Sequence, residues 1–351
     1  MIALRIDALN HPPRTHAARG AHRGLRWPGA ALVVALVLAA AGCAATPAAT
    51  SDSPTTTRTV TDAEGTLVTV PASPTRVVVL SEPTLDGALA VGVTPIGTVT
   101  GRGQSTVPNY LLDRAGDIPL LGGIGQPNYE AIGAADPDLI LVDGTSVNNN
   151  PPVIEALRQI APVVVTGYAG GAWRDNFRQV AGALNRTAEG EQVIADYEAK
   201  VAAARQTLAP HANETFSIVR WQGTAPSLIL KELPPGQALA DLGLRRPAGQ
   251  DTEGRGHSEP VSLENIDRID ADYLFFGTLG GSSVDNPNAG GTADLTGART
   301  ALAAAEKVPG FTTLTAYTEN HIILVDGSAW TSTGGPLLMN RLVDDVLAAL
   351  G

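Results

Sequence analysis

Cysteine and histidine are scarce in this sequence of 351 residues, and their scarcity excludes several kinds of site. Cys43 is the only cysteine, so the chain forms no internal disulfide and no cysteine-rich metal site. Only three of the six histidines, His211, His257 and His321, follow residue 43, and no two of them have the spacing of paired metal ligands. We therefore expect no zinc or manganese site of the histidine-cluster type and no directly bound metal.

Motifs for covalent catalysis and nucleotide binding are also missing. The sequence contains no Gly-x-Ser-x-Gly elbow and no P-loop, and Gly122-Gly-Ile-Gly125 lacks the strand-loop-helix context of a dinucleotide site. We expect a binding protein without a cofactor, not an enzyme. An exported hydrolase is the alternative from a different class, and it requires His257 or His321 to lie beside a serine and an aspartate in a cleft.

Basic residues are outnumbered, since 24 Lys and Arg face 35 Asp and Glu and give a net charge of −11. Such acidity argues against binding to nucleic acid or to anionic membrane surfaces. An anionic ligand must therefore meet local arginines. No apolar segment after residue 43 is long enough to cross a membrane.

The N-terminal segment has the charge arrangement of a secretory signal. Five arginines and one aspartate precede an apolar stretch from Gly29 to Ala41, which at 13 residues is too short for a comfortable membrane span. Cys43 follows directly and resembles the modified cysteine of a bacterial lipoprotein signal, although Ala40 stands where such signals usually carry leucine. The sequence thus predicts a signal peptide over 1–42 and a lipid on Cys43 that anchors an exported protein to the outer face of the cytoplasmic membrane. A buried free thiol is the alternative for Cys43.

The remaining chain is too long for one ordinary domain, and its strand-like and helical stretches alternate, which favours α/β lobes. We expect a flexible linker over 43–58, an N-terminal lobe over 59–186, an inter-lobe helix over 187–210 and a C-terminal lobe over 211–351. A hairpin is expected at 59–61 and 67–70, with further strands at 76–80, 95–99, 139–142, 163–166, 216–221, 227–230, 273–276 and 321–325.

The longest predicted helix has apolar residues at helical spacing from Val193 to Leu208. Thr187 is placed to cap its start, and Pro210 forbids its continuation. At 1.5 Å per residue the helix would extend roughly 35 Å, enough to reach from one lobe to the other.

An internal repeat relates residues 128–141 to residues 262–275. The matching residues are Glu130, Ile132, Asp136 and Asp138 in the first copy and Glu264, Ile266, Asp270 and Asp272 in the second. An Asn or Ser two residues before each glutamate predicts a capped helix that leads into a buried strand. Glu130 and Glu264 are either ordinary first-turn acids or a matched pair of docking points for one partner that contacts both lobes.

The chain resembles the class III substrate-binding proteins of iron-siderophore, haem and vitamin B12 ABC importers. The resemblance runs from about Val60 to Asp345 and rests on motifs that include Leu89-Ala-Val-Gly-Val-Thr-Pro-Ile-Gly97, Asp136-Pro-Asp-Leu-Ile-Leu and Val325-Asp-Gly-Ser-Ala-Trp330. It implies two Rossmann-like lobes joined by a single long α-helix, with the ligand cleft between them. It also implies that Glu130 and Glu264 meet arginines on the permease subunits, and that limited lobe closure leaves a preformed cleft.

Ligands of open α/β sheets collect beyond the carboxyl ends of the strands, so residues just after the predicted strands are the candidate contacts. They are Ser81, Glu82, Arg102, Gln126 and Thr145 in the first lobe, and Arg220, Trp221, Gln222, Arg255, His257, Thr278 and Trp330 in the second. Arg220 is the strongest candidate, because a basic residue that ends an apolar strand has little structural reason to be there. The resemblance implies the same role, since its family counterpart commonly contacts the siderophore. A salt bridge to a nearby acid is the alternative. The two tryptophans are either in the cleft or in the core.

The sequence therefore predicts a monomeric, lipid-anchored receptor that captures an Fe3+-siderophore and delivers it to an ABC permease. Arginine forks and flat aromatic side chains suit the anionic surface of such a complex. Haem or a corrinoid such as cobalamin is the alternative cargo, with His257 as the candidate axial ligand of haem.

Overall fold

The computed structural model describes residues 56–147, 150–251, 257–281 and 290–351. Residues 52–351 form one compact unit. The predicted signal peptide, Cys43, most of the linker and Arg255 lie outside the described residues.

The fold begins with the predicted hairpin. Strand β1 (Thr57–Thr61) pairs antiparallel with β2 (Leu67–Pro71). The connecting turn is closed by the Asp62 side chain, which accepts hydrogen bonds from the backbone N–H groups of Glu64 and Thr66. Gly65 has a φ of 80°, which glycine adopts without steric cost.

The first lobe is built on a three-stranded parallel sheet in the order β3 (Val77–Val79), β6 (Leu139–Val142), β7 (Val163–Val165), and every residue of these strands is buried. Its helices and short strands are α1 (Glu82–Ala90), η1 (Asn109–Leu111), α2 (Leu112–Ala115), β4 (Gly122–Gly123), β5 (Gln126–Pro127), α3 (Tyr129–Ala134) and α4 (Pro151–Arg158). The segment 95–99, predicted as a strand, forms only isolated bridges at Gly97 and Thr98.

The second lobe contains a mixed five-stranded sheet in the order β10-β9-β8-β11-β12. Strand β8 (Phe216–Gln222) is parallel to β11 (Tyr273–Gly277), which is parallel to β12 (Ile322–Leu324). Strand β9 (Ala225–Ile229) is antiparallel to both of its neighbours, β8 and β10 (Ser258–Pro260). The helices are η2 (Ala209–His211), α7 (Pro234–Asp241), η3 (Ala248–Gln250), η4 (Leu263–Ile269), α8 (Leu295–Ala305), η5 (Phe311–Thr313), α9 (Thr315–Thr318), α10 (Gly327–Trp330) and α11 (Pro336–Leu350). Strand β10 is absent from the sequence prediction.

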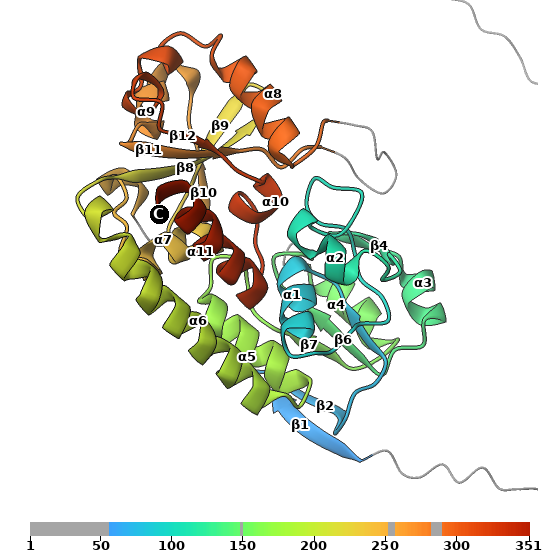
Figure 1. Ribbon diagram of the computed structural model, residues 1–351. Coiled ribbons are helices and arrows are strands. Elements are labelled where there is room, and N and C mark those ends of the chain that lie inside the picture. Colours follow the sequence, from blue (N-terminus) through green and yellow to red (C-terminus); the bar gives the residue numbers. More distant parts are fainter. Residues whose placement is uncertain (1–55, 148–149, 252–256, 282–289) are drawn as a thin grey trace, which may run out of the picture. The chain divides into compact units, whose positions relative to one another are not determined.

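Helices α5 (Trp173–Ala183) and α6 (Thr187–Thr207) connect the lobes, and Figure 1 shows α6 running from α5 toward the second sheet. The long inter-lobe helix is thus present, but its start differs from the prediction. Thr187 is already inside the helix, Arg186 occupies the N-cap position, and no side chain caps this end. At 21 residues the helix is about 32 Å long.

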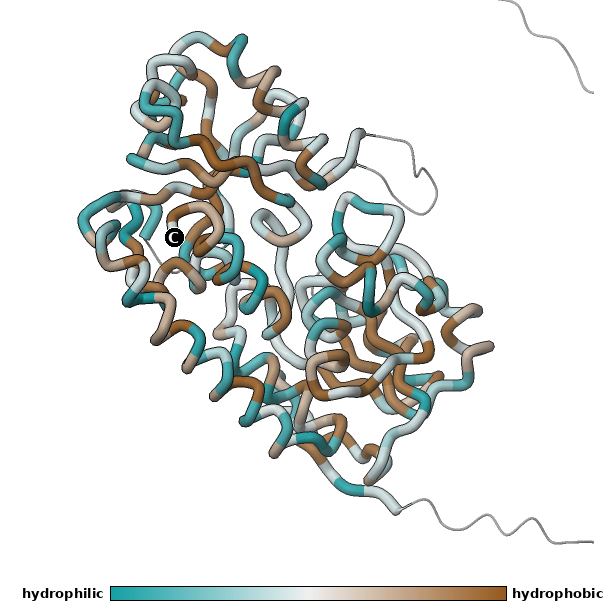
Figure 2. Tube along the Cα trace, in the orientation of Figure 1, coloured by the Kyte–Doolittle hydropathy of each residue, from teal (hydrophilic) through white to brown (hydrophobic). Residues whose placement is uncertain are grey.

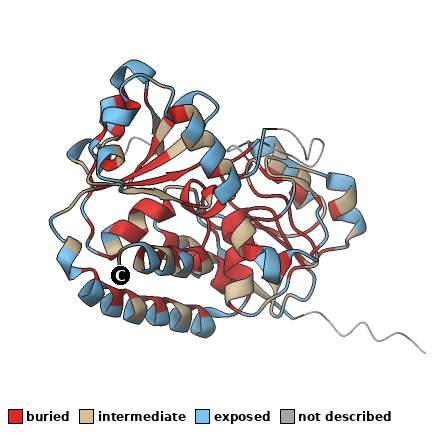
Figure 3. Cartoon of the chain, turned by 45° about the horizontal axis from the view of Figure 1, so that its top comes forward, coloured by how far each residue is buried: buried red, intermediate tan, exposed pale blue. Residues whose placement is uncertain are grey.

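One cluster of buried apolar side chains is shared by both lobes. It extends from Val77 and Leu139 of the first sheet, through Tyr197 of α6, to Phe216 and Phe275 of the second sheet. Figure 2 shows the hydrophobic strands of each sheet, and Figure 3 shows the same strands buried. Because this packing continues across the lobes, large relative movement of the lobes would expose apolar surface and is unfavourable.

Candidate functional site

A small cavity is lined by residues from both lobes. Its lining residues are Arg102, Thr145 and Ala169 from the first lobe and Arg220, Leu233, His257, Thr331, Ser332 and Thr333 from the second. Thr145 and Ala169 follow strands β6 and β7, as expected for a site beyond the carboxyl ends of parallel strands. We call this cavity the cleft. The structure brings together four residues named from the sequence, Arg102, Thr145, Arg220 and His257, and their role in binding stays a prediction.

Arg102 is held in place by a buried carboxylate. Its guanidinium lies 2.5 Å from Glu82 Oε2, and its backbone N–H donates to Glu82 Oε1 at 3.0 Å. Ser81 precedes this glutamate and caps helix α1, forming a capping box with Thr84. Ser81 and Glu82 are both buried and are not among the lining residues. Glu82 contacts the lining residues Arg102 and Ser332, and a contact of Ser81 or Glu82 with a ligand stays a prediction.

Arg220 has no such partner. Its Nη1 donates to the carbonyl oxygen of Thr331 and its Nη2 to Ser258 Oγ, each at 3.3 Å, and it forms no salt bridge with any carboxylate of the described residues. Burial, and then the positive charge of Arg102, lower the pKa of Arg220. The salt bridge considered as the alternative for Arg220 is therefore not seen among the described residues, and Arg220 lines the cleft.

Burial and the two arginines together favour the neutral form of His257. Burial is the largest cause that lowers the pKa of His257, followed by the charges of Arg220 and Arg102. The imidazole is therefore neutral at pH 7. On the other side of Arg102, burial raises the pKa of Asp143 to about 6, while the charge of Arg102 acts in the opposite direction. Asp143 accepts a hydrogen bond from the backbone N–H of Ser146 and belongs to the support of the cleft.

The predicted tryptophan contacts are wrong in location. Trp221 is 1% exposed and packs against Phe276 and Phe311, with ring centroids 5.9 Å and 5.7 Å away. Trp330 is fully buried, and its Nε1 donates to Asp345 Oδ2 at 2.9 Å. Both rings pack against apolar side chains of the second lobe. Burial of a large aromatic ring among apolar side chains is more favourable than its exposure in a polar cleft.

Other candidates from the sequence also lie elsewhere. Gln126 is exposed on the short strand β5, Gln222 donates to the carbonyl oxygen of Gly280, and Thr278 is buried and hydrogen-bonded to the Gln222 side chain. None of the three lines the cleft. Thr331, Ser332 and Thr333 line the cleft but were not among the predicted contacts; their signal in the sequence is three consecutive hydroxyl residues followed by two glycines.

The cleft is nearly closed, which contradicts the expectation of a preformed site. It holds only about 30 Å3 of space, enough for about two water molecules. Hydrogen bonds between the lobes hold it shut: Ser332 Oγ lies 3.4 Å from Glu82 Oε1, and Asn109 bonds to Ser328 and Asp326. A cargo larger than water must separate these residues.

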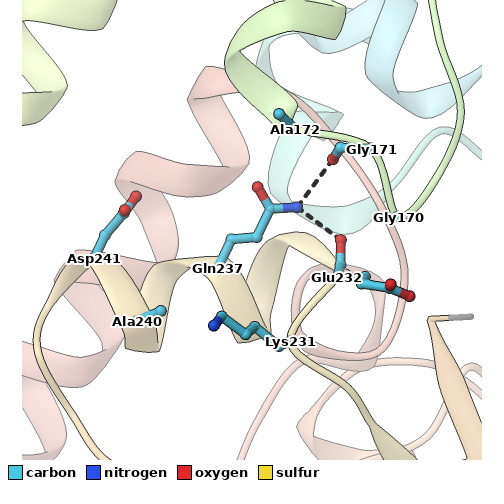
Figure 4. A pocket seen from close by; sticks show the side chains of 8 residues that line it. All are labelled: Gly170, Gly171, Ala172, Lys231, Glu232, Gln237, Ala240 and Asp241. Carbon is cyan, nitrogen blue, oxygen red and sulfur yellow. Dashed lines mark hydrogen bonds between the residues drawn. The ribbon is translucent and has the colours of Figure 1, made fainter. Parts of the chain in front are cut away.

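A larger cavity of about 390 Å3 lies between the loop before α5 and helix α7. Figure 4 shows Gln237 of α7 at its centre, where Nε2 donates to the carbonyl oxygens of Gly171 and Glu232. The backbone N–H of Trp173 donates to Oε1 of the same side chain. Because these bonds tie the second lobe to the loop that enters α5, Gln237 fixes the junction of the lobes.

The two copies of the repeat agree in the role of one aspartate and differ in the cap of the helix. Asp138 accepts hydrogen bonds from Thr75 N and Arg76 N just before β3, and Asp272 accepts two from Thr215 just before β8. Asn128 caps α3 through Ala131 N, as predicted, but Ser262 makes no cap bond and accepts from the side chain of Asn265 instead.

Glu130 and Glu264 are both exposed, in the first turns of α3 and η4. An open groove borders Glu264 and is lined by Leu263, Ile266, Asp267, Asp270, Pro309, Gly310, Thr313 and Leu314. The positions of the two carboxylates are thus compatible with contact to a partner.

The described residues contain no cluster of metal ligands, and His321 does not line the cleft. Within the described ranges no three His, Cys, Asp or Glu side chains gather to hold a metal ion. His321 stacks on Tyr273 and bonds to the carbonyl oxygen of Asp272, away from the cleft. In the part of the chain that the structure covers, no helix is long and apolar enough to cross a membrane.

Comparisons with known proteins agree with this architecture. The chain is 30% identical over 320 residues to the "Probable siderophore-binding lipoprotein YfiY" of Bacillus subtilis, a match that covers 90% of this chain and 94% of that protein. It is 23% identical over 291 residues to the "Putative ABC transporter substrate-binding lipoprotein YhfQ" of the same organism, covering 79% and 84%. The crystal structure of Staphylococcus aureus SirA complexed with staphyloferrin B superposes with a TM-score of 0.70 at 24% identity over 84% of this chain and 98% of that one, which shows a shared fold. The family model "Periplasmic binding protein" matches residues 77–329, and this chain therefore belongs to the periplasmic binding protein family, a family of binding proteins with two α/β lobes.

Proposed function

We propose that this chain captures an Fe3+-siderophore in the cleft and delivers it to an ABC permease. The observation that carries the proposal is Arg220, a partly buried guanidinium that lines a cleft shared by both lobes and has no carboxylate partner among the described residues. The names of two relatives, a probable siderophore-binding lipoprotein and a putative ABC transporter substrate-binding lipoprotein, support the same function for this chain.

The electrostatics favour an anionic ligand. Holding Arg220 partly buried beside Arg102 costs free energy, as the lowered pKa of Arg220 indicates. An anion between the two guanidinium groups offsets that cost and forms charge-assisted hydrogen bonds with both. A ferric complex with anionic oxygens on its surface meets this requirement.

Loading requires the cleft to open by a limited amount. The contacts that close it include the Ser332–Glu82 bond and the bonds from Asn109 to the second lobe, each worth about 1 kcal/mol. The apolar cluster shared through α6 stays packed during such an opening. We infer a hinge movement at the edge of the cleft with the long helix intact.

Delivery uses the two exposed glutamates. Glu130 and Glu264 lie at matching positions of the two lobes, and an arginine on each permease subunit would pair with one of them. A lipid on Cys43 holds the receptor at the outer face of the cytoplasmic membrane. The linker keeps the receptor at high local concentration near the permease.

The test is a titration of the purified chain with ferric complexes, haem and cobalamin, followed by quenching of tryptophan fluorescence. We expect a ferric siderophore to bind with the highest affinity. Arg220→Gln should weaken that binding by about 30-fold, the loss of a charge-assisted hydrogen-bond pair. Arg114→Gln, which removes an exposed arginine of α2, is the matched control and should leave the affinity unchanged.

Two results would contradict the proposal. Binding of haem or cobalamin in preference to every ferric complex would assign the cleft to another cargo, with the neutral His257 as the axial ligand in the case of haem. Equal affinities of the wild type and Arg220→Gln would place the ligand outside the cleft.

A further inference from the structure

We propose that the ferric complex bound in the cleft belongs to the carboxylate class, in which citrate-like hydroxycarboxylate groups hold the iron. The inference rests on the proposed function and names the chemistry of its ligand. It follows from the side chains that both lobes bring to the cleft.

The cleft is rich in hydrogen-bond donors. Of the nine described lining residues, seven carry N–H or O–H groups in their side chains, and none carries a carboxylate. Thr145 Oγ1 accepts from the backbone N–H of Ala169, so its hydroxyl hydrogen is left to donate to a ligand. Thr331 differs, because its hydroxyl already donates to the carbonyl oxygen of Gly327. Such a lining matches a ligand that presents many acceptor oxygens at its surface.

Flat aromatic surface is lacking at the same place. The imidazole of His257 is the only ring on the described part of the lining. Trp330 stacks on Phe275 with ring centroids 4.1 Å apart, and Trp221 packs between Phe276 and Phe311. The two tryptophan rings are therefore used in the core, and a tricatecholate complex would find little aromatic surface on the described lining on which to stack.

The arginines suit carboxylates by their geometry. A guanidinium donates two parallel hydrogen bonds to one carboxylate, an arrangement that an ammonium group cannot reproduce. Arg102 is already bound to the Glu82 carboxylate, through one guanidinium nitrogen and its backbone N–H, whereas Arg220 bonds only weakly, at 3.3 Å, to Thr331 and Ser258. A ligand carboxylate can therefore bind the guanidinium of Arg220 with a smaller loss of existing hydrogen bonds than at Arg102.

The experiment compares three probes on the purified chain: ferric citrate, ferric enterobactin as a tricatecholate and ferrichrome as a trihydroxamate. Isothermal calorimetry and tryptophan quenching give a Kd for each. We expect ferric citrate to bind at least about tenfold more tightly than the other two, the effect of one well-formed charge-assisted hydrogen bond. A tricatecholate or trihydroxamate that binds as tightly as ferric citrate overturns this inference and leaves the proposed function intact, whereas absence of binding by all three overturns both.

Two substitutions test the mode of binding. Arg220→Lys keeps the charge and removes the fork, so affinity for ferric citrate should fall by about tenfold. Thr333→Val keeps the shape of a cleft residue and removes a donor, so the same affinity should fall by about fivefold while the melting temperature stays near that of the wild type. If both variants bind ferric citrate like the wild type, carboxylate recognition by these residues is refuted.

Discussion

The two lobes are built on the same short unit but present different charges to the cleft. Each contains, in the same order, an exposed glutamate, an aspartate that accepts a hydrogen bond from the backbone just before another strand, and a buried strand. At the cleft, Arg102 of the first lobe is paired with the buried Glu82, whereas Arg220 of the second lobe faces no carboxylate of the described residues. The repeated unit therefore supports the fold and the outer surface, while binding depends on what differs between the lobes.

The largest expected effect concerns the repeated glutamates. Replacing both Glu130 and Glu264 by arginine should reduce uptake of iron in cells to the background of a deletion strain, because like charges would meet at the permease. The Kd for the ferric ligand should not change, since neither side chain lines the cleft. Asp113→Arg, at an exposed position of α2, is the control for the change in net charge. A loss of ligand affinity in the double variant would refute the docking role.

Substitution of Arg102, which is paired with Glu82, and of Arg220 should have different effects on ligand binding and on stability. Arg102→Gln leaves Glu82 buried without its cation, so we expect the free energy of unfolding to fall by about 2 kcal/mol. Arg220→Gln removes a charge that burial disfavours, so it should leave stability equal or higher while it weakens ligand binding more than Arg102→Gln does. Urea denaturation and ligand titration of the two variants provide the comparison. The reverse order in both measurements would contradict the division of roles.

The aspartates that precede the strands should be equivalent in the two lobes. Asp138→Ala removes the acceptor of three hydrogen bonds from Thr75 and Arg76 just before β3, and Asp272→Ala removes the acceptor of two from Thr215 just before β8. We expect each variant to lose about 2 kcal/mol of unfolding free energy, measured with urea. Asp267→Ala, at an exposed position of η4, should lose almost nothing. A large loss of unfolding free energy in only one of the two variants would show that the two aspartates do not contribute equally to stability.

The helix caps should differ between the copies. Asn128 accepts from Ala131 N at 3.0 Å, so Asn128→Ala should cost about 1 kcal/mol. Ser262 caps nothing, and Ser262→Ala should therefore be near neutral in a thermal melt. Equal losses would indicate that the second helix is capped in solution.

A smaller effect is expected from pH. Burial, and then the charges of Arg220 and Arg102, lower the pKa of His257 from its ordinary value of 6.5. A bound anion favours the protonated ring and raises that pKa again. The complex thus binds more protons than the free protein, so affinity should rise by about threefold as the pH falls from 8 to 6. The affinity of His257→Asn is measured by calorimetry at each pH. The difference between the two proteins removes the contribution from protonation of the ligand itself. The same pH dependence in both proteins would exclude His257 as its source.

Sequence patterns predicted the elements with strong local signals and failed where tertiary packing decides. The hairpin at 57–71 and strand β6 follow from turn residues and continuous apolar runs, and both are confirmed. Arg220 was placed at the cleft because a charge in an apolar strand is unusual. The locations of Trp221 and Trp330 could not be predicted, because both the core and the cleft adjoin the strands that carry them.

The closed state of the cleft also escaped prediction. Its closure depends on hydrogen bonds between residues more than 200 positions apart in the chain, such as Asn109 with Ser328 and Glu82 with Ser332. Local patterns carry no information about such contacts. The hydroxyl run 331–333 was visible in the sequence, but only the folded chain shows that it lies opposite Arg102.

The central claim is that a ferric ligand binds between the unpaired and the paired arginine. Anomalous diffraction at the iron edge, from crystals grown with ferric citrate, tests it most directly. The account predicts an iron peak in the opened cleft, between the guanidinium groups of Arg102 and Arg220. An iron peak in the cavity around Gln237 or on the outer surface, with the cleft still closed, would contradict it.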